Sequence, residues 1–258
     1  MNDLYIGTSG YSYKDWEIVF YPAGIKPAGY LDFYGRFFNT VEINSTYYSI
    51  PVNDMFYKME RKTPQGFLFS IKAHSSMTHT KDASKDMIKY FKIALEALIK
   101  NAKMGVLLFQ FPYSFGYNLK NLDYLKELKE VFNSFDMVFE FRNIGWVRDS
   151  VMDFLKNQNI GFCNVDEPDL PGLMPKTNFV TNDYFYLRFH GRNKQNWWNH
   201  KEAYERYDYM YKTEELESWV PKIKEASDKT KKSLIYFNNH FKAKSVNSAL
   251  MLKNLLLK

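Results

Sequence analysis

Short apolar runs alternate along the chain with longer segments whose apolar residues recur at helical spacing. Eight of these runs are five to seven residues long and rich in Val, Ile, Leu, Phe and Tyr, which is typical of buried strands. The predicted strands are residues 4–8, 40–44, 67–72, 105–111, 137–142, 161–166, 184–190 and 234–238. Residues 87–99, 122–132 and 246–257 each carry an apolar stripe at three- and four-residue intervals, so we predict helices there.

Two connecting segments depart from this pattern. Pro168, Pro171 and Pro175 prevent a long helix between the sixth and seventh strands, so we predict a loop with a short turn there. Residues 191–212 are polar and rich in Tyr and Trp, and we predict a long loop after the seventh strand. Because this loop starts at the end of a strand, we expect it to cover a pocket there.

Alternating strands and helices favour a parallel sheet, and eight such units favour its closure into a barrel. A (β/α)8 TIM barrel commonly takes about 250 residues, close to the 258 residues of this chain. We therefore predict an α/β protein with one domain, a single TIM barrel over residues 1–258. An open doubly wound sheet is the alternative, although no G-x-G-x-x-G turn follows the first strand.

Polar side chains gather toward the carboxyl ends of the predicted strands. Side chains alternate between the two faces of a strand, and the apolar set is expected to pack on the helices. By this rule Cys163 faces the helices, and the polar residues of the opposite parity point into the barrel. These inward residues are Glu42, Asn44, Lys72, Gln110, Glu140, Arg142, Asp166, Arg188 and His190, with either Asn238 or Asn239 from the eighth strand. In a TIM barrel this end holds the active site, so we predict a mixed-charge pocket; an ion-pair network that only seals the barrel is the alternative.

The residue types at this pocket suggest roles. Guanidinium and ammonium groups bind phosphate or carboxylate, so Lys72, Arg188 and Arg142 are predicted to bind an anionic substrate. Glu140 and His190 are the first choices for proton transfer. The remaining predicted site residues are Glu42 and Asp166, which would orient the catalytic pair, and Asn44, Gln110, Asn238, Asn239 and Trp146, which would contact substrate.

Cofactors are not predicted. Carboxylates and an imidazole at Glu42, Glu140, Asp166 and His190 would suit a divalent metal, so a metal site stays open as a weaker alternative. The inward Lys and Arg side chains would repel a cation, and the sequence has no H-x-x-x-H or H-E-x-x-H motif.

Composition excludes several classes of protein. With 45% hydrophobic and 25% charged residues, the chain can bury a core, which argues against disorder. A single cysteine excludes an internal disulfide framework. No apolar run approaches the roughly 18 residues of a membrane helix, and residues 1–10 do not resemble a signal peptide. We therefore expect a cytoplasmic protein that does not enter a membrane.

The net charge of +6 raises the possibility of nucleic-acid binding. Only 7 of the 35 basic residues are Arg, the type that nucleic-acid readers favour, and like charges form no long block. The aromatic and basic loop at 191–212 could support this alternative, because its rings could stack on bases. We favour the other interpretation of this loop, in which it anchors itself by burying the aromatic faces and keeps the hydroxyl groups in water. A barrel mouth can also admit an extruded nucleotide.

Several sequence blocks at the strand ends resemble the YecE-like family, TIM-barrel proteins classed as a domain of unknown function. The match extends over essentially the whole chain and rests on GTSGYSYKDW (7–16), FYP (20–22), NTVEINSTYY (39–48), FSIKAHSSMTH (69–79), LLFQFPYSF (107–115), EFRNIGW (140–146), YLRFHGR (186–192) and YFNNH (236–240). The resemblance implies the barrel fold but no particular reaction. It differs at Tyr11, where Trp is more usual, and at residues 143–145.

We therefore expect an enzyme that uses acid/base chemistry on a small polar, anionic substrate, either phosphorylated or nucleotide-like. The residues leave the reaction open between a hydrolase, a lyase and an isomerase. The two alternatives from other classes are a nucleic-acid binding or processing protein and a barrel that binds a ligand without converting it. The sequence does not indicate an oligomeric state.

Overall fold

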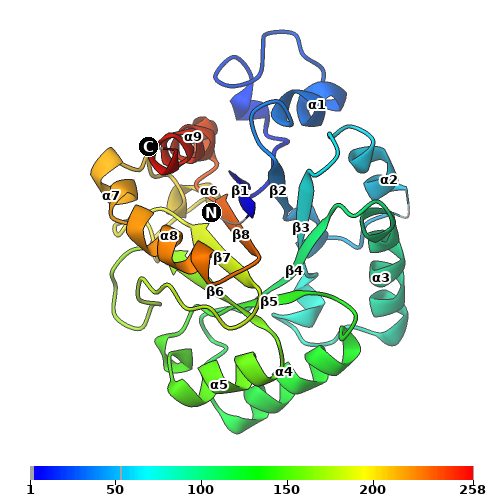
Figure 1. Ribbon diagram of the computed structural model, residues 1–258, viewed down its shortest axis with the longest axis vertical. Coiled ribbons are helices and arrows are strands. Elements are labelled where there is room, and N and C mark those ends of the chain that lie inside the picture. Colours follow the sequence, from blue (N-terminus) through cyan, green and yellow to red (C-terminus); the bar gives the residue numbers. More distant parts are fainter. Residues whose placement is uncertain (1–2, 53, 258) are drawn as a thin grey trace.

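The computed structural model describes residues 3–52 and 54–257. Its eight strands are β1 (Asp3–Thr8), β2 (Thr40–Ile43), β3 (Leu68–Lys72), β4 (Met104–Gln110), β5 (Met137–Glu140), β6 (Gly161–Asp166), β7 (Tyr184–Phe189) and β8 (Lys232–Phe237). All paired strands are parallel, in the order β1-β8-β7-β6-β5-β4-β3-β2. Helices surround this nearly closed sheet (Figure 1). The predicted TIM barrel is confirmed, and each predicted strand matches an observed one within three residues at either end.

The helices differ greatly in length. They are α1 (Tyr30–Tyr34), α2 (Met55–Glu60), α3 (Lys85–Lys100), α4 (Leu119–Val131), α5 (Asp149–Asn157), α6 (Ala203–Arg206), α7 (Thr213–Glu217), α8 (Val220–Asp228) and α9 (Lys244–Leu256). Single 3₁₀ turns lie at Lys14–Trp16, Pro27–Gly29, Ser45–Tyr47, Ser75–Met77, Ile144–Trp146 and Phe241–Ala243. The three helices predicted from apolar stripes correspond to α3, α4 and α9. Within the described chain, no helix is both long enough and apolar enough to cross a bilayer.

Side-chain caps define where two long helices begin. The Ser84 hydroxyl accepts a hydrogen bond from the backbone amide of Met87 at the start of α3, and the Asn118 side chain caps α4 in the same way. The proline-rich connection 167–183 contains no helix, as predicted. The long loop after β7 contains only the single helical turn α6.

The barrel closes between β1 and β2 largely through side chains, at a place that we call the seam. The Tyr34 hydroxyl accepts a hydrogen bond from the backbone amide of Thr8 at 2.9 Å and donates to the backbone oxygen of Thr40 at 3.1 Å. Lower in the seam, the Asn39 side chain bonds both a backbone oxygen and an amide of β1. Above it, the Gly10 amide donates to a backbone oxygen of β2 at 2.7 Å. Tyr34 therefore replaces a missing ladder bond between the two strands.

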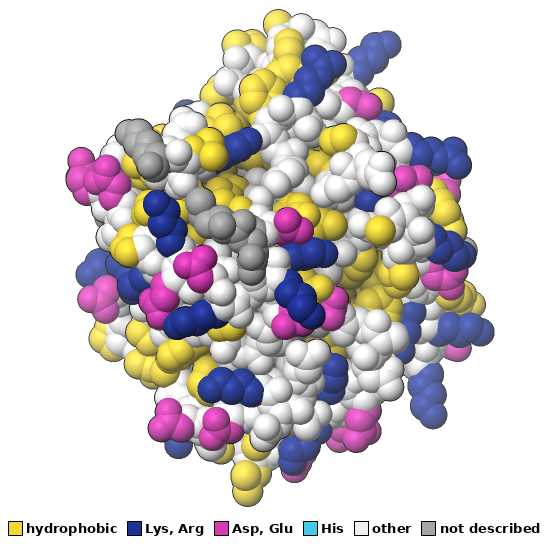
Figure 2. Space-filling view, viewed as in Figure 1, with side chains coloured by type: hydrophobic (Ala, Val, Ile, Leu, Met, Phe, Trp, Pro, Cys, Tyr) yellow, Lys and Arg dark blue, Asp and Glu magenta, His cyan; other side chains and the backbone are white. Residues whose placement is uncertain are grey.

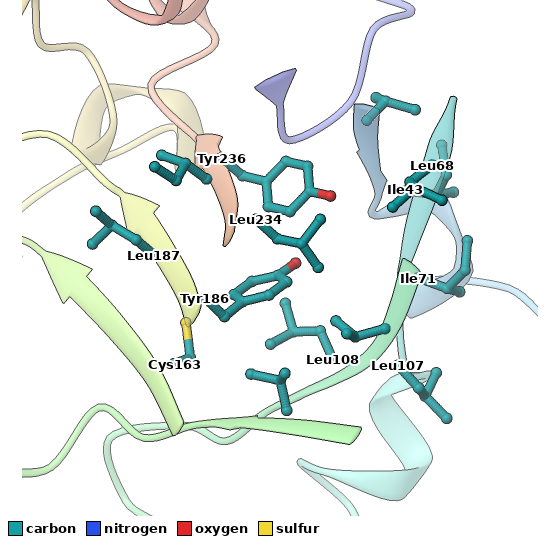
Figure 3. Close-up of a cluster of buried hydrophobic side chains, with 14 of the residues drawn as sticks. Ile43, Leu68, Ile71, Leu107, Leu108, Cys163, Tyr186, Leu187, Leu234 and Tyr236 are labelled. Atoms are coloured by element: carbon teal, nitrogen blue, oxygen red, sulfur yellow. The ribbon is translucent and has the colours of Figure 1, made fainter. Parts of the chain in front are cut away.

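Aromatic and aliphatic side chains fill the barrel interior below the mouth. The rings of Tyr186 and Tyr236 point toward the axis, with their centroids 5.3 Å apart (Figure 3). The Tyr236 hydroxyl lies 2.6 Å from Thr40 Oγ1 and 2.9 Å from Ser70 Oγ, so it is satisfied inside the core. This orientation of Tyr236 resolves the ambiguous parity of β8, because Asn238, two residues further on, must point inward as well.

Replacing Tyr34 with Phe should weaken the seam. The variant leaves the buried Thr8 amide without its acceptor, and we expect the free energy of unfolding to fall by about 1–3 kcal/mol. Urea denaturation followed by circular dichroism measures this change. Tyr90→Phe is the control, because Tyr90 is 56% exposed and its loss should change stability by less than about 0.5 kcal/mol. Equal effects of the two changes would contradict the role of Tyr34.

Candidate functional site

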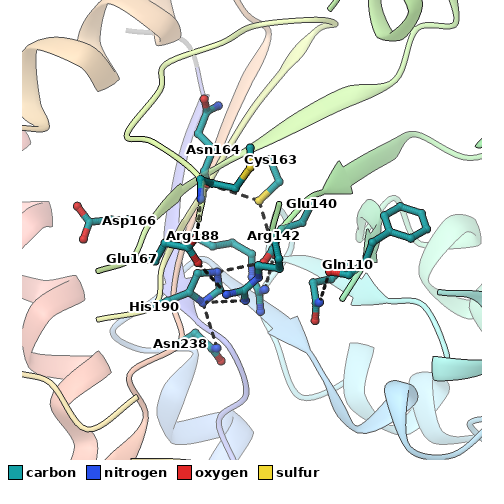
Figure 4. A network of polar contacts seen from close by, with 12 residues as sticks. Gln110, Glu140, Arg142, Cys163, Asn164, Asp166, Glu167, Arg188, His190 and Asn238 are labelled. Atoms are coloured by element: carbon teal, nitrogen blue, oxygen red, sulfur yellow. Dashed lines mark hydrogen bonds and ion pairs between the residues drawn. The ribbon is translucent and has the colours of Figure 1, made fainter. Parts of the chain in front are cut away.

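A buried ion-pair network lies under the carboxyl ends of the strands. One carboxylate oxygen of Glu140, at the end of β5, lies 2.5 Å from Arg188 Nη1. The other lies 2.5 Å from Arg142 Nε and 3.1 Å from His190 Nε2 (Figure 4). The second terminal nitrogen of Arg188 bonds Glu42 Oε1 at 2.6 Å. These side chains from β2, β5 and β7, and from the residues after β5 and β7, thus form one connected cluster.

Glu167, which follows β6, completes this cluster. Its Oε2 lies 3.0 Å from Arg142 Nη1, and its Oε1 accepts a hydrogen bond from the backbone amide of Met174 at 2.9 Å. Burial raises the pKa of Glu167 to about 7, although Arg142 partly opposes that rise. We call Glu42, Glu140, Arg142, Glu167, Arg188 and His190 the mouth network. Sequence reasoning missed Glu167, because it stands one residue beyond the predicted strand.

The predicted parity of β6 is wrong. Cys163 Sγ lies 3.7 Å from Glu140 Oε2, so Cys163 faces the barrel interior and not the helices. Asp166 points away from the mouth network (Figure 4). Its carboxylate binds the Arg192 guanidinium at 2.8 and 2.6 Å and the Trp219 indole nitrogen at 2.7 Å. Polarity marked the wrong face of β6, because its polar residues Asn164 and Asp166 bind partners on the outer face, whereas Cys163 lies on the inner face.

Two other predicted contact residues lie away from the cavities. Trp146 is buried and stacks on Phe141 with ring centres 4.4 Å apart. Its indole nitrogen donates a hydrogen bond to the backbone oxygen of Phe115. Asn239 has the outward parity of β8, and its side chain donates to the backbone oxygen of Tyr209 at 2.8 Å. Both residues stabilise segments around the barrel, so the structure does not bring them to the site with the other predicted residues.

Two cavities lie above the mouth network, with volumes of about 600 and 530 Å³. The first is lined by most of the predicted binding residues, namely Asn44, Lys72, Gln110, Arg142, Arg188 and Asn238. Both cavities are lined by Tyr48, Lys72, Gln110, Arg142 and Tyr207, so they adjoin along this row of residues. We call the two cavities together the mouth cleft. Tyr207 belongs to the loop after β7, so this loop borders the cleft as expected.

Lys72 is held differently from the two arginines. Its ammonium nitrogen donates to Gln110 Oε1 at 2.8 Å and lies 4.2 Å from the ring centre of Tyr47. Among the described residues it forms no ion pair with a carboxylate, since those of the mouth network bind Arg142 and Arg188. Burial, together with the nearby positive charge of Arg188, lowers the pKa of Lys72 to about 7. This amine therefore changes protonation near neutral pH.

His190 and Glu140 lie below the cleft, and the histidine is neutral while the glutamate is ionised. Burial and the charge of Arg142 lower the pKa of His190 well below its usual value, so the imidazole is neutral. Its Nε2 faces Glu140, and its Nδ1 lies 3.2 Å from the Asn238 amide nitrogen, which assigns the proton to Nε2. Burial alone would raise the pKa of Glu140, but Arg142 and Arg188 outweigh it and hold that pKa well below its usual range.

Sequence reasoning also missed an aromatic wall of the first cavity. Tyr13 and His240 line it and stack on each other with ring centres 4.5 Å apart. Within the described part of the chain, His240 Nδ1 and Asn44 Oδ1 are buried atoms that have no hydrogen-bond partner. Both residues line the first cavity, so each can contact a ligand there. The blocks GTSGYSYKDW and YFNNH contained the signal for Tyr13 and His240.

A metal site at the predicted carboxylates finds no support in this geometry. No group of three His, Cys, Asp or Glu side chains converges on a position suited to a metal ion in residues 3–52 and 54–257. Asp166 lies on the other face of β6, and the oxygens of Glu42 and Glu140 already bind arginines.

The fold and the site define a TIM-barrel protein with a polar, mixed-charge cleft at its carboxyl-terminal mouth. The chain belongs to the DUF72 family, described as "Protein of unknown function DUF72", whose model matches residues 5–258. This finding confirms the resemblance to YecE-like proteins.

Individual relatives agree with this family. The chain is 31% identical over 255 residues to the UPF0759 protein YunF of Bacillus subtilis (strain 168), and this match covers 92% of this chain and 89% of YunF. The crystal structure of a DUF72 family protein from Thermotoga maritima MSB8 has a TM-score of 0.91 and 39% identity, over 99% of this chain and 100% of that one. A DUF72 family protein from Enterococcus faecalis V583 has a TM-score of 0.88 and 25% identity, over 99% and 96%.

Replacing Glu140 with Gln should destabilise the protein. The change removes the negative charge shared by Arg142 and Arg188, and breaking a buried ion pair costs about 3–5 kcal/mol. Urea denaturation at pH 7 measures this loss. Glu130→Gln is the control, because Glu130 is exposed on α4 and should change stability by less than about 0.5 kcal/mol. Wild-type stability of the Glu140 variant would show that the network does not depend on this carboxylate.

Proposed function

We propose that this protein is an enzyme that binds a small anionic substrate in the mouth cleft and transfers protons to or from it. A phosphorylated or nucleotide-like compound fits the size and the charge of the cleft. The observation that carries the proposal is the position of Lys72 and Arg142, which line both cavities. An anion that lies where the cavities adjoin can therefore contact two cations at once.

The charge balance of the cleft supports this binding mode. The carboxylates of Glu42, Glu140 and Glu167 lie behind the arginines, so the cations face the cleft and the anions do not line it. A bound anion would favour the protonated form of Lys72 and raise its pKa. Asn44 and His240 line the first cavity as well, so both residues can contact the uncharged part of the substrate.

Lys72 lines the cleft, whereas Glu140 and His190, the first choices from the sequence, do not, so we favour Lys72 for proton transfer. A general acid or base works best with a pKa near the working pH, and Lys72 has such a pKa. Glu140 and His190 lie beneath the cleft and contact each other. Glu140 also contacts Arg142, and His190 also contacts Asn238. We therefore assign them a positioning role, in which they orient Arg142 at the floor of the cleft.

The nucleic-acid alternative has less support. Lys and Arg side chains are interspersed with Asp and Glu on the face of the molecule in Figure 2 and do not form one basic region. In the aromatic loop, Trp197 is buried and packs near Tyr207. The guanidinium group of Arg206 lies 5.4 Å from the ring centre of Trp197. These rings serve the packing of the loop, which leaves fewer of them free to stack on bases.

Glycerol 3-phosphate is a suitable probe for the proposed site. Lys72→Met should weaken its binding at least about tenfold, because a hydrogen bond to a charged group contributes roughly 1.5–3 kcal/mol. At pH 7.5 the wild-type protein should take up roughly half a proton more on binding than the variant, since the anion raises the pKa of Lys72. Titration calorimetry in two buffers of different ionisation enthalpy measures both effects.

The control is Lys89→Met, which removes an exposed lysine on α3 and should leave the affinity unchanged. The same affinity and proton uptake in the wild type and the Lys72 variant would overturn the proposed role of Lys72. Binding of DNA or RNA that weakens steeply with salt, without binding of glycerol 3-phosphate, would favour the nucleic-acid alternative instead.

A further inference from the structure

The side-chain amide of Gln110 has a fixed orientation in its hydrogen bond with Lys72. Gln110 Nε2 donates to the backbone oxygen of Phe111 at 2.7 Å, so the other end of the same amide, Oε1, must face Lys72 Nζ. Oε1 accepts one hydrogen from Nζ, and as a neutral oxygen it does not require a positive charge on Lys72. A neutral amine fits this contact, because it can donate one hydrogen and keep its lone pair free.

The free side of this amine faces space for a ligand. Lys72 lines both cavities, so a carbonyl carbon placed near Nζ can carry one substituent into each of them. Arg142 lines both cavities as well and can bind an anionic group of the same molecule. In the empty cleft, the low pKa of Lys72 supplies the neutral form at physiological pH, which is the nucleophilic one. In this binding mode the anionic group contacts Arg142, so that Lys72 can stay neutral.

We propose that Lys72 is a nucleophile that forms an imine with a small anionic aldehyde or ketone, such as a 2-oxo acid or a phosphorylated sugar. The inference rests on the proposed function, because it assumes that the substrate is an anion in the mouth cleft. It adds the class of substrate, a carbonyl compound, and it gives Lys72 a covalent role.

The bond changes balance with one added proton. The lone pair of Nζ attacks the carbonyl carbon, a C–N bond forms, and the carbonyl π electrons move to the oxygen, which takes a proton. The oxygen of the resulting carbinolamine takes a second proton and leaves as water. Of the two protons in this water, one comes from the amine itself and the other comes from solvent or from a residue that lines the cleft. The nitrogen lone pair then forms the C=N bond, and a protonated imine and one water remain.

This intermediate narrows the reaction class. A protonated imine withdraws electrons from the neighbouring carbon, so a C–H or C–C bond there can break with less charge build-up. That chemistry belongs to lyases and isomerases and is not needed by a hydrolase. The hydroxyl groups of Tyr48 and Tyr207, which line both cavities, are available to donate the proton that the leaving oxygen requires.

Reductive trapping tests the proposal on the full chain. The protein is incubated at pH 7.5 with dihydroxyacetone phosphate or with pyruvate, reduced with borohydride, and analysed by intact mass and peptide mapping. We expect one adduct per chain, located on Lys72, with at least one of the two probes. Lys72→Arg, which keeps the positive charge, should lower the yield at least tenfold. An adduct spread over surface lysines and unchanged in Lys72→Arg would overturn the proposal.

Gln110→Glu provides a second variant that keeps the amine. A carboxylate at this position would hold Lys72 protonated, so the trapping yield at pH 7 should fall about tenfold and recover as the pH rises toward 9. Gln65→Glu adds the same charge at an exposed position away from the cleft and should leave the yield unchanged. A yield in Gln110→Glu equal to that of the wild type at pH 7 would contradict the role of the neutral partner.

The outcome for the imine is separate from that for anion binding. Binding of glycerol 3-phosphate that depends on Lys72, with no adduct from either carbonyl probe, would overturn the imine and leave the proposed function standing. Absence of both would overturn both. An adduct on Lys72 that glycerol 3-phosphate suppresses by competition would support both.

Discussion

The buried guanidinium group of Arg188 is the constraint on which the rest of the site depends. Its side chain is 1% exposed, and an unpaired charge at that depth costs several kcal/mol. Two carboxylates, Glu42 on β2 and Glu140 on β5, therefore bind it. Neither strand is a neighbour of β7 in the sheet, so these ion pairs cross the barrel interior and hold three separate strands at one height. Tyr186 donates to the other oxygen of Glu42 and joins this charged layer to the aromatic layer below.

The chemistry of Lys72 follows from the pairing of the nearby carboxylates with arginines. Glu140 binds both arginines, and Glu167 binds Arg142, so the acids of the mouth network are bound to guanidinium groups. An arginine keeps its charge when it is buried, whereas a lysine loses its proton readily. Among Lys72, Arg142 and Arg188, the lysine is therefore the group whose charge can change, and the positive charge of Arg188 further favours its neutral form. The three acids of the mouth network are thereby bound to two arginines, and Lys72 is left at the cleft without a carboxylate partner among the described residues.

Short apolar runs were sufficient to predict the eight strands, because the strands are buried on both faces over most of their length. The inward residues of β2, β3, β4, β5 and β7 also followed from parity, since apolar side chains cover the outer faces of these strands. Parity failed on β6, where Asn164 and Asp166 find polar partners outside the barrel and Cys163 packs inside it. The seam was not predictable either. It depends on Tyr34 meeting the backbones of two strands, a tertiary contact that leaves no periodic signal in the sequence.

The two faces of β6 connect the floor of the cleft to its cover. On the inner face, Cys163 contacts Glu140, and the strand leads to Glu167, which binds Arg142. On the outer face, Asp166 binds Arg192 at the start of the loop that carries Tyr207 over the cleft. Because side chains alternate strictly along a strand, a slip of one residue would exchange these two sets. It would bring an aspartate into the mouth network in place of Glu167 and release the loop from its buried carboxylate. The pairing register of β6 therefore determines both the charge at the floor of the cleft and the position of the loop above it.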